Sequence, residues 1–220
     1  MKPEIFVDAL AQINLPNVFN PYADRCSVHD EPHADRTRRA NLLEFLRGAL
    51  KLKVDTLWMG RDLGYNGGRR TGLALTDEYH LPVLRTVYDT PAVGRATRGA
   101  VAKERTASEI WSIIQGVKRP PFLWNVFPFH PFETGNPFTN RKFTAAELAA
   151  VNHLNHALIQ GLGIRRIVAI GQDAASYSRD FGVEVVTVRH PSYGGTTEFR
   201  SGISALYPTY RSASIQAQMF

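Results

Sequence analysis

The sequence predicts an α/β protein with three layers, in which helices cover both faces of a central, mostly parallel sheet of four strands. Short, continuously apolar runs are typical of strands that are buried on both faces of a parallel sheet. Such runs alternate with segments of helical periodicity, which favours parallel strands joined by crossover helices. The four expected strands are residues 54–60, 122–127, 166–171 and 183–188.

The longer helices are expected before and between these strands. Residues 4–13 are expected to form a short helix, and residues 17–22 a turn. In residues 34–52 apolar side chains recur at helical spacing with arginines opposite. Thr106 and Thr144 each stand three residues before a glutamate, which is the capping-box spacing, so a helix is expected to begin at each.

The remaining segments are shorter or irregular. Short helices are expected from Thr76, over residues 173–181 and over residues 197–206, with a possible continuation of the last one near Tyr210. Residues 90–103 are rich in small and basic residues and are expected to be a loop. At 220 residues the chain is long enough for one substantial core, so we expect a single domain over residues 1–220.

The composition narrows the class of protein. A hydrophobic fraction of 44% and a charged fraction of 21% are typical of a soluble globular protein. No apolar run is long enough to span a bilayer, and the first residues lack a signal-peptide pattern, so we expect a cytoplasmic protein. One cysteine argues against an intrachain disulfide and against a cysteine-rich metal site. The net charge of +6 favours a polyanionic partner.

Three of the expected strands end near a polar side chain: Asp62, Asn125 and His190. Ligands of parallel sheets bind beyond the carboxyl ends of the strands, so this edge is the candidate site. Asp62 could act on a water or a cation, or it could pair with a nearby arginine. Asn125 lies in an apolar run, and burying an amide without partners costs about 1–3 kcal/mol. It is therefore either bonded to backbone or presented to a ligand.

His190 is followed by Pro191 and Ser192, and a glycine pair comes soon after. A fixed imidazole can stabilise a developing oxyanion by donating a hydrogen bond, even when the ring is neutral. Ser192 and the following backbone amides could bind a phosphate. The alternative is a histidine that only ends a strand. A Ser/His/Asp triad is discounted because Ser192 lacks a nucleophile-elbow sequence.

These segments, taken together, resemble the uracil-DNA glycosylase superfamily. The resemblance rests on residues 60–65, 122–126 and 190–192, which occur in the order of that superfamily's motifs. Residues 70–76 and the loop of residues 128–144 agree as well. The resemblance extends over roughly residues 54–200. With one cysteine the chain lacks the ligands of the iron–sulfur branches, so it resembles a divergent member.

The resemblance implies hydrolysis of the N-glycosidic bond of deoxyuridine in DNA after base flipping, which leaves an abasic site. Asp62 would hold the attacking water, and His190 would donate to the departing base. Asn125 would read the uracil edge. The other residues implied in the base pocket are Gly60, Arg61, Tyr65, Leu75 and Trp124. Those implied in DNA binding are Arg69, Arg70, Ser192, Tyr193, Gly194 and Arg200. No metal or other cofactor is implied.

The sequence departs from the superfamily pattern at three positions. Leu63 and Gly64 follow Asp62, so the expected tyrosine, Tyr65, comes one place late. Leu75 stands where an aromatic ring should stack on uracil. Either Leu75 packs on the base less specifically, or Tyr65, Trp124 or Phe127 supplies the ring. Gly194 replaces the expected leucine wedge and leaves Tyr193 as the substitute. A weak wedge predicts a preference for single-stranded or easily opened DNA. The protein itself is expected to be a monomer.

Two other functions remain open from the sequence. The missing ring and wedge are compatible with a nucleic-acid-binding relative that has no catalytic activity. The glycine-rich segment after residue 63 is compatible with an unrelated enzyme that binds a nucleotide or phosphate, although no Gly-Lys-Ser/Thr follows the glycines.

Overall fold

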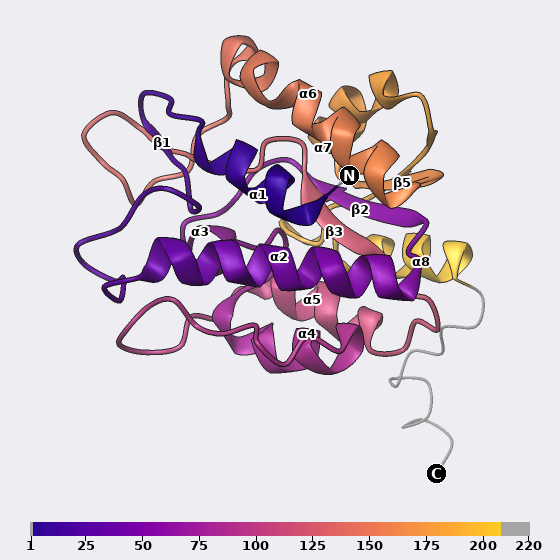
Figure 1. Ribbon diagram of the computed structural model, residues 1–220. Coiled ribbons are helices and arrows are strands. Elements are labelled where there is room, and N and C mark those ends of the chain that lie inside the picture. Colours follow the sequence, from indigo (N-terminus) through magenta and orange to yellow (C-terminus); the bar gives the residue numbers. More distant parts are fainter. Residues whose placement is uncertain (1, 208–220) are drawn as a thin grey trace.

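The computed structural model describes residues 2–207, and its centre is a parallel sheet of four strands. The strands are β2 (Thr56–Gly60), β3 (Phe122–Asn125), β5 (Arg166–Ile170) and β6 (Glu184–Val188). Their order across the sheet is β3-β2-β5-β6, and every neighbouring pair is parallel (Figure 1). The expected strands and their parallel arrangement are therefore confirmed.

Helices pack on both faces of this sheet. The longer ones are α1 (Pro3–Ala11), α2 (Ala34–Leu52), α4 (Leu81–Tyr88), α5 (Arg105–Ile114), α6 (Ala145–Leu162) and α8 (Thr196–Leu206). The short ones are α3 (Gly68–Thr71), α7 (Gln172–Ser178) and the 3-10 turns η1 (Glu78–His80) and η2 (Arg179–Phe181). The expected continuation near Tyr210 lies outside the described residues.

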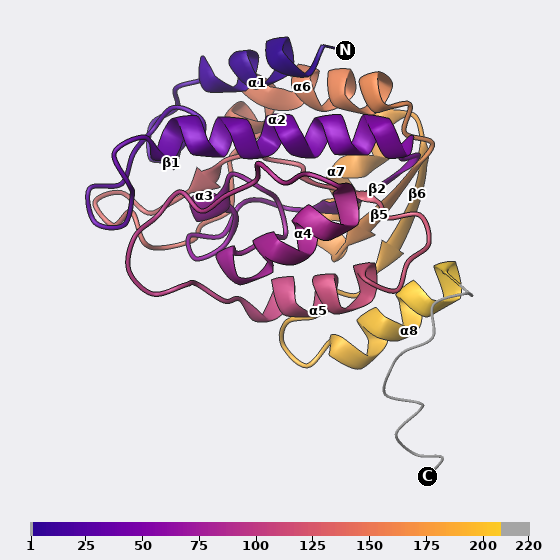
Figure 2. The ribbon, with the colours of Figure 1, turned by 60° about the horizontal axis from the view of Figure 1, so that its bottom comes forward.

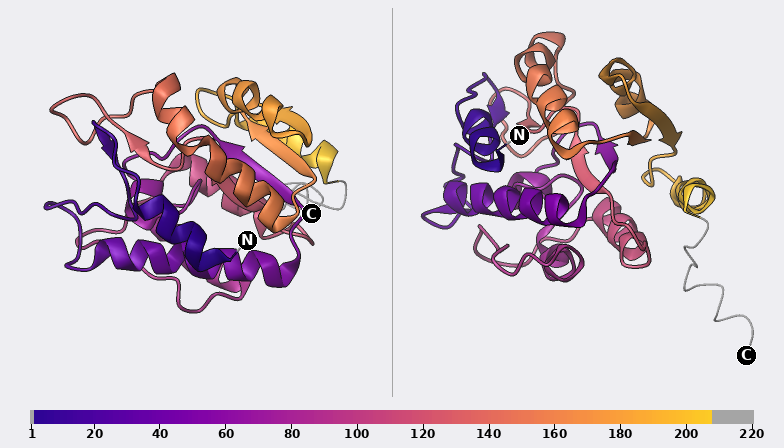
Figure 3. Two further views of the ribbon diagram at one scale, coloured as in Figure 1. Left: turned by 45° about the horizontal axis from the view of Figure 1, so that its top comes forward. Right: turned by 45° about the vertical axis from the view of Figure 1, so that its right-hand side comes forward.

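Two tryptophans on neighbouring strands show how the layers pack. On one face Trp124 of β3 packs against Phe6 of α1, with ring centroids 5.8 Å apart. On the other face Trp58 of β2 packs against Phe199 of α8, with centroids 6.4 Å apart. Helices α1 and α6 accordingly lie above the strands in Figure 2, and α5 and α8 lie below. Figure 3 shows the orange α6 and the yellow α8 on opposite sides of the sheet. The three-layer architecture is thus confirmed.

The start of α6 agrees with the sequence, but the start of α5 does not. Thr144 and Glu147 form the expected capping box at α6, and Gly163 ends that helix in the left-handed conformation. The capping box expected at Thr106 is wrong. Helix α5 begins at Arg105, after Glu104, and no side chain caps it. The backbone N–H of Glu104 donates to the Asp77 carboxylate at 2.6 Å, so a residue distant in sequence determines where the helix begins.

A second, two-stranded sheet was not expected. Strand β1 (Val18–Phe19) pairs antiparallel with β4 (His130–Pro131) inside what looked like a turn and a loop. Each strand is only two residues long, too short for a periodic pattern. Among residues 2–207, no helix combines the length and apolar character that a bilayer crossing requires.

Candidate functional site

All four parallel strands deliver residues to one edge of the sheet. Gly60 ends β2 and Asn125 ends β3, and the two are register partners. Gly171 directly follows β5, and His190 comes two residues after β6. Because the strands are parallel, these four positions lie at the same carboxyl edge. The structure therefore brings together the ends of the three motifs that the sequence singled out.

Asn125 forms the innermost part of this edge with Gly60 and Leu75. Its side chain is 1% exposed, and its Oδ1 atom has no hydrogen-bond partner among the described residues. A Cβ atom at Gly60 would overlap Oδ1 and would lie 3.1 Å from Leu75 Cδ2. Leu75 has φ 54°, a left-handed conformation that points to a constrained loop. Of the two possibilities for Asn125, the unpaired oxygen favours presentation to a ligand.

Asp62 is held by its neighbour Arg61. The Arg61 Nε atom donates to Asp62 Oδ2 at 2.6 Å, and Arg61 Nη1 donates to Asp173 Oδ2 at 3.1 Å. The Asp62 side chain is only 9% exposed. Burial raises the pKa of Asp62, Arg61 opposes that rise, and the negative charge of Asp173 adds to it. Asp62 is therefore a desolvated carboxylate, and it shares Arg61 with Asp173. The structure confirms that Asp62 pairs with a nearby arginine, and this pairing leaves a role toward a water or a cation open.

His190 is fixed in one tautomer by the loop that follows it. The backbone N–H of Ser192 donates to His190 Nδ1 at 3.1 Å, so Nδ1 is an acceptor and Nε2 carries the ring proton. Burial lowers the pKa of His190, and the charges of Arg189 and Arg61 lower it further. The ring is thus a neutral imidazole whose Nε2–H can donate to a ligand.

The loop after His190 carries one exposed aromatic side chain and a serine whose hydroxyl group lies near that of Thr106. Tyr193 is 97% exposed and has φ 53°, so its ring stands away from the protein in a strained turn. Ser192 Oγ lies 3.4 Å from Thr106 Oγ1, in the first turn of α5. Gly194, at φ 79°, completes the turn. Arg200 is exposed on α8 and pairs with Glu109 of α5 at 2.8 Å.

Two of the residues predicted for the base pocket lie elsewhere. Trp124 is 1% exposed within the core, and its Nε1–H donates to Asn155 of α6 at 2.9 Å. Phe127, the alternative ring, is buried against Phe129 and Phe143. Both side chains belong to the hydrophobic core, so assigning Trp124 to the pocket is wrong. Tyr65 is half-buried, and its backbone N–H donates to Asn140 Oδ1 at 3.2 Å.

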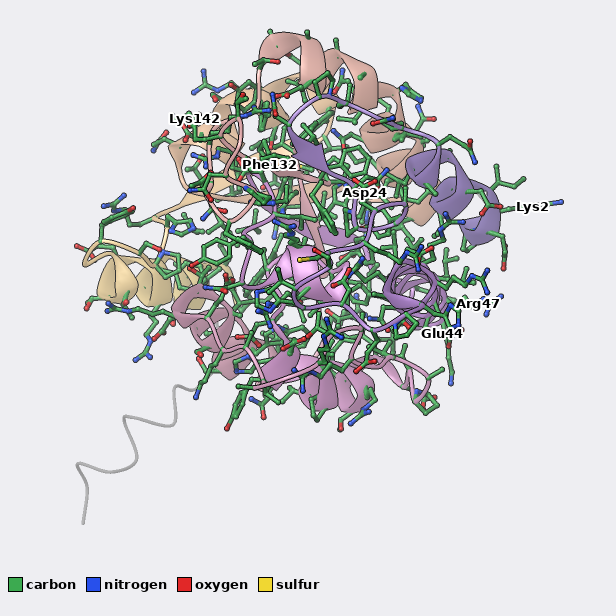
Figure 4. All side chains as sticks on the ribbon, turned by 90° about the vertical axis from the view of Figure 1, so that its left-hand side faces the viewer. Lys2, Asp24, Glu44, Arg47, Phe132 and Lys142 are labelled. Carbon is green, nitrogen blue, oxygen red and sulfur yellow. The ribbon has the colours of Figure 1, made fainter. Side chains whose placement is uncertain are left out.

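The two arginines predicted to bind DNA point into the protein. Arg69 is 5% exposed. Its guanidinium lies over the rings of Phe19 and Phe138, 4.1 and 5.3 Å from their centroids, and donates to the Pro137 carbonyl. With Phe132 and Asp24, labelled in Figure 4, it lines a hollow of about 390 Å³.

Arg70 is also largely buried, and it pairs with Glu78 at 3.5 Å. Both DNA-binding assignments are therefore corrected, because the loop turns these side chains away from the surface.

Two acidic residues at the site were not found from the sequence. Asp173, in the first turn of α7, bonds Arg61. Glu104 lies against the glycine-rich loop, where a Cβ at Gly64 would be 3.3 Å from its Oε1 atom and a Cβ at Gly67 would overlap its carboxylate. Burial and the nearby Asp77 raise the pKa of Glu104 to about 7. Only a three-dimensional arrangement could reveal either residue, since both come from elements distant from the motifs.

The described part of the chain holds no group of three or more histidine, cysteine, aspartate or glutamate side chains that could bind a metal ion. The chemistry available at this edge is thus a desolvated carboxylate, an unpaired buried amide and a neutral imidazole donor.

Comparison with known proteins gives one informative result. No protein-family model and no curated protein matches the chain. Among solved structures, the fold is similar to the crystal structure of wild-type SMUG2 from Pedobacter heparinus, with a TM-score of 0.61 and 16% sequence identity. The match covers 96% of this chain and 97% of that chain. A likeness at this identity is one of fold, and it agrees with the three-layer α/β arrangement expected from the sequence.

Proposed function

We propose that this chain, whose fold is that of the uracil-DNA glycosylase superfamily, is a DNA glycosylase that releases uracil from DNA. The observation that carries the proposal is the unpaired Oδ1 atom of Asn125, buried where Gly60 leaves space. A buried acceptor without a donor is costly, and a ligand N–H removes that cost. The imide N3–H of uracil supplies this donor, and the Asn125 amide N–H can in turn donate to the adjacent carbonyl.

The other two groups match the charges that develop as the bond breaks. A water attacks C1′ of the deoxyribose, the C1′–N1 bond breaks, and its electron pair leaves with the base. Asp62 accepts the water proton and faces the positive charge on the sugar. His190 Nε2–H donates to a uracil carbonyl oxygen, where the negative charge of the departing base gathers. The products are free uracil and an abasic deoxyribose in the strand.

Contacts with the DNA backbone are proposed for the surface around His190. Ser192 and Thr106 place two hydroxyl groups side by side at the start of α5, where the backbone N–H groups of the helix also favour an anion. Tyr193 projects from the same loop and would fill the space that a flipped base leaves. The net charge of +6 supports association with the phosphates. We propose single-stranded DNA as the preferred form.

An excision assay tests this proposal. A labelled oligonucleotide with one deoxyuridine, single- or double-stranded, is incubated with the protein and then cleaved with alkali at abasic sites. We expect cleavage at the deoxyuridine position, and about 10²–10³-fold less with Asp62→Asn or His190→Ala. Asp180→Asn changes an exposed aspartate outside the site and serves as the control.

Binding of the oligonucleotide without any abasic product would overturn the proposal and favour a nucleic-acid-binding relative without catalytic activity. Cleavage that neither Asp62→Asn nor His190→Ala reduces would refute the assigned roles.

A further inference from the structure

The segment that leads into α7, from Gly171 to Asp173, contacts both His190 and Arg61. A Cβ atom at Gly171 would lie 3.2 Å from His190 Cβ, so the backbone at Gly171 packs directly against His190. Two residues later, Asp173 Oδ2 accepts a hydrogen bond from Arg61 Nη1 at 3.1 Å. Neither the motifs nor the fold comparison assigns a role to this segment.

Arg61 is shared between two carboxylates with different surroundings. On its inner side, Nε and Nη2 face Asp62 at 2.6 and 3.4 Å. On its outer side, Nη1 faces Asp173, whose side chain is 45% exposed. The Lys142 ammonium, at the surface in Figure 4, lies 3.0 Å from the same Asp173 carboxylate. Three ion pairs therefore connect the surface to the site: Lys142 with Asp173, Asp173 with Arg61, and Arg61 with Asp62.

We propose that Asp173 is a positioning residue of the site, which holds Arg61 by its outer nitrogen and so keeps Arg61 from fully neutralising Asp62. This inference rests on the proposed function, because it assigns Asp62 the task of accepting a proton from water. Arg61 faces both carboxylate oxygens of Asp62 through Nε and Nη2, and its third nitrogen, Nη1, bonds Asp173. The Asp173 charge therefore offsets part of the positive charge that Arg61 presents to Asp62, which leaves Asp62 the stronger base.

The charges around Asp62 give the direction of the expected effect. The charged groups that face Asp62 are Arg61 beside it, Asp173 of α7 and Arg141 from the loop before α6. Arg141 is itself paired with Glu147 at 2.6 Å. Asp173 raises the pKa of Asp62, whereas Arg61 and Arg141 lower it. Removing the Asp173 charge must therefore lower the pKa of Asp62 and weaken it as a base.

The test compares Asp173→Asn with Asp180→Asn, which makes the same charge change at an exposed position of η2. On single-stranded uracil DNA we expect Asp173→Asn to lower kcat about 5- to 10-fold at neutral pH with an unchanged KM. The acidic limb of its pH–rate profile should move to lower pH. Asp173→Glu should restore most of kcat, and Asp180→Asn should behave as the wild type.

The results separate the two proposals. If the wild type excises uracil but Asp173→Asn changes only KM, or has the kcat and pH profile of the wild type, the positioning role is refuted and the function stands. If the wild type excises nothing, the function fails, and an NMR titration of the Asp62 carboxyl carbon in the free protein decides the inference. A lower Asp62 pKa in Asp173→Asn than in the wild type supports the role of Asp173, and an equal pKa refutes it.

Discussion

The Oδ1 atom of Asn125 faces Gly60 so closely that a Cβ atom at residue 60 would overlap it. The two residues are register partners at the ends of β3 and β2. Gly60 is thus required by a close approach, not by its backbone angle, which is that of an ordinary strand. The unpaired buried acceptor thus lies where a side chain at residue 60 would be.

Gly60→Ala should therefore displace the Asn125 amide. We expect a loss of excision activity of about 10²-fold, because a contact misplaced by about 1 Å can cost this much. A thermal melt should show a folded protein, since alanine is compatible with a strand end. Gly94→Ala is the control, because a Cβ there would meet only the Ala92 carbonyl, at 3.9 Å. Equal activity of Gly60→Ala and the wild type would show that the Asn125 amide does not contact the substrate.

Asn125→Ala should reduce activity without the usual penalty for truncating a buried residue. Removing an unsatisfied buried polar group recovers about 1–3 kcal/mol, which offsets the lost packing. We expect urea denaturation to show a change of less than about 1 kcal/mol in the free energy of unfolding. Leu123→Ala, two residues earlier on β3 and fully buried in the core, should cost about 2–5 kcal/mol. A comparable loss in both variants would show that Asn125 is bonded within the protein.

His190 should act as a neutral donor. Burial and two arginines lower the pKa of His190 below the ordinary value of 6.5. The ring is therefore uncharged at neutral pH. Nitrogen-15 NMR at pH 7 should show a neutral ring protonated on Nε2. Because no imidazolium is present to lose its proton, kcat should not fall as the pH rises from 6.5 to 8. An imidazolium at pH 7 would contradict this assignment. His153, exposed on α6, provides the control resonance.

Glu104 should make stability depend on pH. Its pKa is about 7 in the folded protein, above the ordinary value of 4.5, because burial and Asp77 disfavour the charge. The folded state therefore binds more protons than the unfolded state between these values, and stability falls as the pH rises toward about 7. Glu104→Gln removes this dependence, so its melting temperature relative to wild type should increase from pH 5 to pH 8. Glu198→Gln, at an exposed position of α8, should show no such increase.

A melting difference for Glu104→Gln that is the same at both pH values would contradict the raised pKa.

Tyr193 should matter more for double-stranded than for single-stranded DNA. Its ring is almost fully exposed, so Tyr193→Ala should leave the fold intact. Opening a duplex costs a few kcal/mol, which a ring inserted into the stack can offset, whereas a single strand needs no opening. We expect about a 10-fold loss on duplex DNA and less than about 2-fold on single strands, with recovery in Tyr193→Phe. Equal losses on both substrates would rule out a wedge.

The sheet and the position of its functional edge could be predicted because both follow from local patterns. Continuous apolar runs predict buried parallel strands, and the polar residue after each run must then lie at the carboxyl edge. Arg69 and Trp124 could not be assigned correctly, because the same side chains suit a surface, a pocket or a core, and only packing decides. The cation–π contact of Arg69 with Phe19 joins residues 50 positions apart in the chain, and no sequence pattern marks it.

The two acidic residues were missed for a related reason. Asp173 looks like an ordinary first-turn aspartate, and Glu104 looks like a solvated charge before a helix. Their roles follow from neighbours on other elements, Arg61 for Asp173 and the glycine-rich loop for Glu104. The prediction of a capping box at Thr106 was wrong for the same reason. The distant residue Asp77 accepts a hydrogen bond from the backbone of Glu104, and α5 begins directly after Glu104.

Mass spectrometry of the free base shows directly whether the protein releases uracil and whether Asn125 is needed for it. The wild-type protein is incubated with two single-stranded oligonucleotides that differ at one position, which holds uracil or cytosine. If Asn125 receives an imide N–H and His190 donates to the departing base, free uracil should accumulate to one equivalent per uracil strand. No free base should come from the cytosine strand, because cytosine N3 carries no hydrogen, and Asn125→Ala should release uracil much more slowly than the wild type. A folded wild-type protein that releases no uracil, or that releases it as fast without the Asn125 amide, would contradict the account.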